Sequence, residues 1–176
     1  MGGLASQDVM RFLDALGSVY EEHATLYLIG GGALCLLGSP RRTMDIDFSL
    51  PMSGETQHLV ETMLALADEM KIELEVITLE EFVPAPSDAA QRHRHVGQFG
   101  GIDVYIYDPY TIALSKLARG LESDIQDVLF LLEKGVIEME ELNRIVDQAI
   151  PLAWRRDVDP EDLQRYLAEV QRLFYH

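Results

Sequence analysis

The sequence predicts an α+β fold in which a small sheet flanked by helices is followed by a C-terminal helical extension. The first part of the chain mixes short strand-like runs with longer helical periodicities, whereas the last part contains helical patterns alone. The length of 176 residues suits one domain with a helical appendage, and a chain of this size buries about 70% of its unfolded surface. We expect a core over residues 1–108 and a helical region over residues 109–176 that packs on it.

The expected elements of the core follow in order. Apolar positions at helical spacing predict a helix over residues 7–22, with Ser6 as its N-cap. The apolar run 26–29 predicts a strand that ends in three glycines. The remaining elements are a short helix over 33–37, an alternating strand over 44–50, a helix over 55–70 capped by Ser53, a strand over 72–79, and a hairpin of strands 96–99 and 102–107 joined through Gly100 and Gly101.

The expected elements of the last part are helices with clear ends. Asp108-Pro109 and Asp159-Pro160 each place a capping Asp before a Pro at the first helical position. Gly120 and Gly135 are typical helix stops. We expect helices over 109–119, 122–134, 138–148 and 160–173, and we expect Trp154 to pack the last of them against the core.

Composition limits the classes of function. The formal net charge of −16 disfavours sequence-independent binding to nucleic acid, because an acidic surface repels phosphate backbones. Cys35 is the single cysteine, so no internal disulfide forms, and its apolar surroundings predict core packing. No apolar run approaches the roughly 20 residues of a membrane span, and no secretory signal precedes the first helix. We therefore expect a cytoplasmic protein without a membrane partner.

Two acids on the strand 44–50 carry the strongest chemical indication. Asp45 and Asp47 point the same way from the strand, so their oxygens can converge on one divalent ion or straddle two. Carboxylates and substrate phosphates are the ligands that Mg²⁺ prefers. The turn Gly30-Gly31-Gly32 precedes them, and a glycine turn at a helix start lets backbone N–H groups approach phosphate. Together the two features predict a site for a metal and a triphosphate.

This combination resembles the nucleotidyltransferase superfamily. Its signature is a hydrophobic residue, Gly, then Gly or Ser, a spacer, and finally Asp-hydrophobic-Asp-hydrophobic. Here Ile29-Gly30-Gly31 is separated by thirteen residues from Asp45-Ile46-Asp47-Phe48. The chain is also similar, over about residues 26–132, to minimal bacterial nucleotidyltransferase-like proteins of the uncharacterised or toxin–antitoxin-associated kind. The matching residues are Gly30, Gly31, Gly38, Arg42, Thr43, Asp45 and Asp47, with Lys116, Asp124, Asp127 and Leu131 in a later segment.

The resemblance implies both a fold, a small mixed sheet flanked by helices, and a chemical reaction. The reaction is Mg²⁺- or Mn²⁺-dependent transfer of a nucleoside monophosphate from a nucleoside triphosphate such as ATP to a protein or RNA acceptor. A third carboxylate is expected on a later strand, and Asp103 is favoured because it is the only acid in an otherwise apolar and aromatic strand. Glu73 and Glu75 are the alternatives, but they alternate with Leu74 and Val76 as residues of an ordinary solvated face do, which favours Asp103 over them. Asp45, Asp47 and Asp103 are thus the expected catalytic and metal-binding residues.

The resemblance also implies which residues hold the nucleotide: Gly30, Gly31, Arg42, Thr43 and Lys116. The alternatives are a plain surface charge for Arg42 and an exposed helix lysine for Lys116. Tyr105, Tyr107 and Tyr110 could stack on a base, although strand tyrosines usually pack. One departure is Gly31, where many active relatives carry Ser. It leaves open a catalytically weak or inactive relative that binds nucleotide or an antitoxin-like protein partner.

Overall fold

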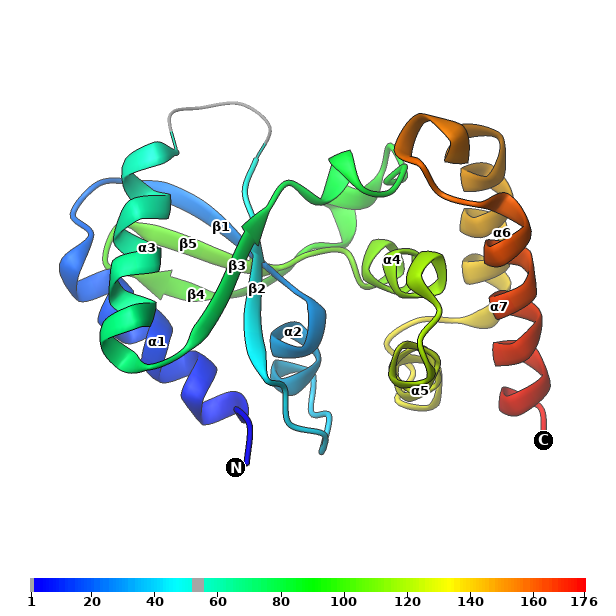
Figure 1. Cartoon of the computed structure of the whole chain (residues 1–176), viewed down its shortest axis with the longest axis horizontal. Coiled ribbons are helices and arrows are strands. Elements are labelled where there is room, and N and C mark those ends of the chain that lie inside the picture. Colours follow the sequence, from blue (N-terminus) through cyan, green and yellow to red (C-terminus); the bar gives the residue numbers. More distant parts are fainter. Residues whose placement is uncertain (1, 52–55) are drawn as a thin grey trace. The chain divides into compact units, whose positions relative to one another are not determined.

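The computed structural model describes residues 2–51 and 56–176 (Figure 1). By contacts the chain divides into two compact units. The first comprises Met1–Thr78 with Arg94–Tyr107, and the second comprises Leu79–His93 with Asp108–His176. The domain boundary expected after residue 108 stays a prediction, and the contacts group residues 79–93 with the helices that follow.

The first unit is built on a five-stranded mixed sheet, as expected for the α+β class. Strand β1 lies in the middle, antiparallel to β2 and parallel to β5. Strand β3 runs parallel to β2 at one edge, and β4 runs antiparallel to β5 at the other. The strands are β1 (Ala24–Ile29), β2 (Asp45–Ser49), β3 (Glu73–Ile77), β4 (Arg94–Phe99) and β5 (Ile102–Ile106).

Three helices belong to this sheet unit: α1 (Ser6–Val19), α2 (Gly30–Leu36) and α3 (Gln57–Met70). The apolar side chains of one sheet face are buried, and Phe12 of α1 contacts Phe48 of β2 with ring centroids 5.9 Å apart. In Figure 1, α1 and α3 lie side by side over the sheet. This face is therefore the core, which leaves the other face to carry polar side chains.

Two expected helix starts are wrong in this unit. The N-cap of α1 is Ala5, not Ser6, because the carboxylate of Asp8 accepts the Ala5 backbone N–H at 2.8 Å. Helix α2 begins at Gly30, immediately after β1, which places the glycine turn in its first turn. The expected cap Ser53 and the expected helix start at residue 55 lie outside the described residues.

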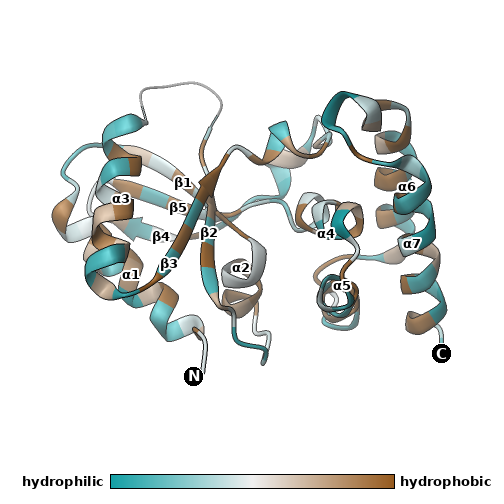
Figure 2. Cartoon of the chain, in the orientation of Figure 1, coloured by the Kyte–Doolittle hydropathy of each residue, from teal (hydrophilic) through white to brown (hydrophobic). Residues whose placement is uncertain are grey.

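The second unit is helical, and its two Asp-Pro starts are confirmed. Asp108 accepts the backbone N–H of Tyr110 at 3.1 Å, and Asp159 accepts that of Glu161 at 2.9 Å. Figure 2 shows apolar and polar stretches alternating along the long C-terminal helices, as amphipathic helices require. The elements are α4 (Pro109–Arg119), α5 (Glu122–Glu133), α6 (Met139–Ala149) and α7 (Pro160–Phe174), with 3-10 helices η1 (Leu79–Glu81), η2 (Ala89–Arg92) and η3 (Ile150–Arg156).

Trp154 does not pack as expected. It lies in η3, and its side chain is 74% exposed, with the guanidinium of Arg155 over its ring at 5.4 Å. Within the described ranges, no helix combines the length and the apolar character that a membrane crossing requires.

Candidate metal centre

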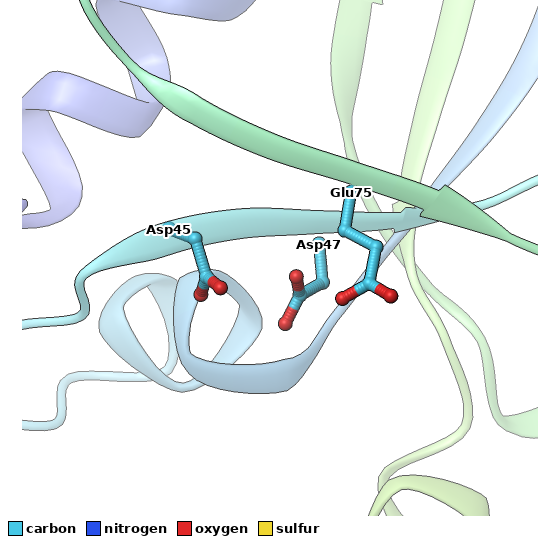
Figure 3. A group of neighbouring side chains, drawn as sticks. All are labelled: Asp45, Asp47 and Glu75. Carbon is cyan, nitrogen blue, oxygen red and sulfur yellow. The ribbon is translucent and has the colours of Figure 1, made fainter.

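Asp45 and Asp47 point to one side of β2, as their spacing predicts. Ile46 and Phe48, which alternate with them, are fully buried on the core side. Glu75 of β3 is the register partner of Asp47. In Figure 3 all three carboxylates leave the same face of the two strands. One oxygen from each lies within 4.8 Å of the others, so the structure brings three acids together.

The chemistry of this group suits a divalent cation. Asp45 and Asp47 are half-buried and Glu75 is exposed, so the group opens to solvent. Three like charges at this separation repel one another, and a cation between them removes that cost. Carboxylate oxygens are the protein ligands of Mg²⁺, which keeps further positions for water and substrate phosphate. The residues present therefore fit the metal that the sequence predicts.

Asp103 is not a member of this group. It lies on β5 in register with Thr25 of β1, and its carboxylate is 3.5 Å from Nε2 of His95. Because β1 separates β5 from β2, Asp103 is two strands away from the strand that carries Asp45 and Asp47. Among the described residues, the third acid beside that pair is Glu75.

On sequence alone Asp103 is favoured because it stands among apolar residues, whereas Glu75 alternates with apolar residues as on a solvated face. The solvated face that this alternation predicts is confirmed, since Glu75 is exposed. The pairing of β3 with β2 decides which acids lie beside Glu75. It puts Glu75 opposite Asp47 and Glu73 opposite Asp45. Strand pairing of this kind cannot be read from one strand's composition.

The glycine turn touches the carboxylate group directly. Gly30 has a positive φ of 61°, a conformation that favours glycine. A Cβ atom built on Gly30 would also lie 3.3 Å from both Cβ and Cγ of Asp47. A side chain at residue 30 would therefore be strained and would crowd Asp47, so glycine is favoured where the chain turns from β1 into α2.

Thr43 explains the glycine at position 31. A Cβ atom built on Gly31 would lie 2.7 Å from Cβ of Thr43, which is closer than real Cβ contacts. Thr43 is held in place, since its hydroxyl donates to the carbonyl of Asp45 at 2.9 Å and its backbone pairs with Leu4. The Thr43 side chain from the neighbouring loop therefore occupies the space that a side chain at residue 31 would need.

Arg42 precedes Thr43 in the same loop and is exposed. Its Nη1 atom donates to the backbone carbonyl of Gly3 at 2.9 Å, so the guanidinium ties the N-terminal segment to the loop. The arrangement leaves a positive charge three residues before Asp45. Its role toward a phosphate stays a prediction.

Lys116 belongs to the helical unit and is not an exposed helix lysine. Its side chain is 6% exposed, and Nζ lies 2.7 Å from Asp127 and 3.7 Å from Asp124. Burial by itself would raise the pKa of Asp124, but the hydrogen bonds from Arg119 and the charge of Lys116 outweigh it, so that pKa is lowered. The three charged groups form a buried network within α4 and α5.

Comparisons with known proteins were made on the whole chain. A family model described as nucleotidyltransferase of unknown function (DUF6036) matches residues 7–170. No curated protein matches the chain. Among solved structures, the chain is similar to an antigenic nucleotidyltransferase-like protein from Paracoccidioides brasiliensis, with 18% identity over 97% of this chain and 90% of that one and a TM-score of 0.49.

Proposed function

We propose that this chain, which belongs to the family of nucleotidyltransferases of unknown function, catalyses a metal-dependent nucleotide transfer. The proposed reaction moves a nucleoside monophosphate from a nucleoside triphosphate to a hydroxyl group of a protein or RNA acceptor. The observation that supports it best is the group of Asp45, Asp47 and Glu75, which lies against the glycine turn of α2.

The residues of the chain divide the work as follows. Asp45, Asp47 and Glu75 would hold a divalent cation, Mg²⁺ or Mn²⁺, which would offset the charge of the triphosphate and lower the pKa of the attacking hydroxyl. Gly30 and Gly31 would bring the triphosphate to the backbone N–H groups at the start of α2, beside Asp47.

The acceptor oxygen then bonds to the α-phosphorus while pyrophosphate leaves, so no covalent intermediate with the protein is required. Arg42 is an exposed cation of the loop before Asp45, next to Arg41, and stays our choice for a phosphate contact. Lys116 was also expected to contact phosphate, but its charge is engaged by Asp127 and Asp124, which favours a structural role.

The metal site can be tested with the full chain before any acceptor is known. Calorimetry with Mn²⁺ alone should show binding to the wild type, and Asp45→Asn and Glu75→Gln should each weaken it by tenfold or more, since each removes a ligand. Glu73→Gln is the matched control on the same strand, because Glu73 lies outside the group. Asp103→Asn should bind Mn²⁺ like the wild type. If it loses binding while Glu75→Gln retains it, the third ligand is Asp103.

The reaction is tested with α-labelled nucleoside triphosphates and Mg²⁺. Pyrophosphate release or label transfer that disappears in Asp45→Asn supports the transferase. Magnesium-dependent ATP binding without turnover supports the alternative of a catalytically inactive relative that binds nucleotide, and association with an antitoxin-like protein then becomes the activity to measure. A wild type that binds no nucleotide in the presence of Mg²⁺ contradicts both.

A further inference from the structure

A row of aromatic rings crosses the sheet beside the metal centre. Tyr27 of β1 is the register partner of Tyr105 of β5, and Tyr105 is the register partner of His95 of β4. The ring centroids of Tyr27 and Tyr105 are 5.8 Å apart, and those of His95 and Tyr105 are 5.0 Å apart. Register partners on neighbouring strands share a face, so the three rings form one continuous surface.

This row lies on the face that carries the carboxylates. Tyr27 is also the register partner of Ser49, which stands two residues after Asp47 on β2. Because side chains alternate along a strand, Ser49 and Asp47 point the same way. Asp47 pairs with Ile29, and Gly30 follows Ile29. The rings and the glycine turn therefore lie on opposite sides of Asp47 along the strand direction.

The rings are held in place but keep part of their surface accessible. Tyr27 and Tyr105 are half-buried and His95 is exposed. Tyr107 packs edge-on against Tyr27, with centroids 5.5 Å apart and an interplanar angle of 71°, which fixes the Tyr27 ring. Tyrosine rings are enriched at interfaces, and accessible aromatic rings are surfaces on which nucleobases stack.

We propose that Tyr27, Tyr105 and His95 form the surface on which a nucleobase stacks during the reaction. The inference rests on the proposed function, because the stacked base would belong to a substrate whose phosphate binds at the metal centre. The charge of the surroundings favours a base over a phosphate, because Asp103 beside His95 and the carboxylates beyond Tyr27 repel anions but tolerate a neutral ring. The base comes either from the nucleoside triphosphate or from the terminal nucleotide of an RNA acceptor.

The test compares ligands with and without a base. Full-length wild type, Tyr27→Leu and Tyr105→Leu are titrated, in the presence of Mg²⁺, with ATP, with inorganic tripolyphosphate and with a short single-stranded oligoribonucleotide. Stacking of one base predicts a loss of affinity of roughly 5- to 150-fold in the Leu variants. Tripolyphosphate affinity should not change, because that ligand has no ring.

The pattern of losses identifies the source of the base. A loss confined to ATP assigns the surface to the donor nucleotide, and a loss confined to the oligoribonucleotide assigns it to the acceptor. Tyr105→Phe keeps the ring and should bind like the wild type. Tyr175→Leu is the control for removing an exposed tyrosine elsewhere. Circular dichroism shows whether each variant is folded, and two substituted strands give two independent tests.

The outcomes separate this inference from the proposed function. Suppose that the wild type binds tripolyphosphate and ATP, and that Tyr27→Leu and Tyr105→Leu bind these ligands and the oligoribonucleotide with the same affinity as the wild type. The stacking surface is then rejected, whereas the proposed metal centre is not. If the Leu variants lose tripolyphosphate as well, the rings support the fold rather than a base, which also rejects the surface. If the wild type binds none of the three, the proposed function and the surface fail together.

Discussion

At the scale of single residues, Thr43 decides what fits at the glycine turn. Its Cβ atom lies 2.7 Å from where a Cβ of residue 31 would stand, so Gly31→Ala forces two fixed atoms apart. We expect the free energy of unfolding to fall by about 1–3 kcal/mol, the usual cost of overpacking. Urea denaturation measures it.

Gly32→Ala is the matched control in the same helix. The Cβ added there meets nothing closer than 3.5 Å, an ordinary contact. Since Ala favours a helix interior over Gly by up to about 1 kcal/mol, Gly32→Ala should leave stability unchanged or raise it. Equal losses in both variants would contradict the role given to Thr43.

The residues of the site differ in how far sequence could predict them. Asp45 and Asp47 follow from the alternation along one strand, which is a local property, and the structure places them on one face as expected. The choice between Glu75 and Asp103 depends on which strands are neighbours, and pairing between strands far apart in the chain leaves no local pattern. The role of Thr43 beside Gly31 was equally hidden, because it arises from a loop folding back on a helix.

At the scale of elements, helices α4 and α5 are joined by the buried charges of Lys116 and Asp127. Their 2.7 Å contact is nearly inaccessible to water, so Lys116→Met leaves the carboxylate of Asp127 without its partner ammonium. We expect a loss of about 3–5 kcal/mol in the free energy of unfolding. Asp127→Asn should cost a similar amount, and the double variant should lose less than the sum.

Lys134→Met is the control for this pair, because Lys134 is the C-cap of α5 and its side chain is exposed. Its effect should stay within about 0.5 kcal/mol. Additive losses in the double variant would show that Lys116 and Asp127 act independently.

The segment η2 is fixed to the start of α4 by a pH-sensitive contact. Nδ1 of His93 accepts the backbone N–H of Asp108 at 2.9 Å, which requires that nitrogen to be unprotonated. Burial lowers the pKa of His93 below its ordinary 6.5, and the repulsion of Arg92 adds to this against the attraction of Asp108 and Glu80. The unfolded chain therefore binds a proton that the folded chain does not.

Stability should consequently fall as pH drops through the ordinary histidine range. Between pH 7.5 and pH 5.5, urea denaturation of the wild type should show a larger loss than that of His93→Gln, whose side chain cannot protonate. The rest of the chain is identical in the two proteins, so the comparison isolates residue 93. The same slope in both would mean that His93 binds its proton equally in the folded and unfolded chain.

Most helices and strands could be predicted, because capping residues and apolar periodicity depend only on residues close together in the sequence. Asp108 and Asp159 cap their helices as expected. Trp154 is the exception that shows the limit. A large apolar ring predicts burial, but η3 carries it to the surface, where Arg155 lies over it.

At the scale of the whole molecule, the net charge of −16 sets the response to salt. Raising NaCl from 10 mM to 1 M shortens the screening length from about 30 Å to about 3 Å. Screening weakens the repulsion among 30 acidic residues, and it also weakens exposed pairs such as Arg172–Glu169, which contribute little. Repulsion is the larger effect, so the midpoint of thermal unfolding should rise with salt. A falling midpoint would show that ion pairs dominate.

The central position of β1 has a consequence for synthesis on the ribosome. One edge of β1 pairs with β2, which follows soon after it, but the other edge waits for β5, whose end at Ile106 is translated 57 residues after Ser49. At 5–20 residues per second, that interval is about 3–11 s. In the later part of this interval, after Glu75 is translated, the nascent chain holds Asp45, Asp47 and Glu75 while one edge of β1 is still unpaired. A chaperone that shields nascent strands would therefore act on this protein before its sheet can close.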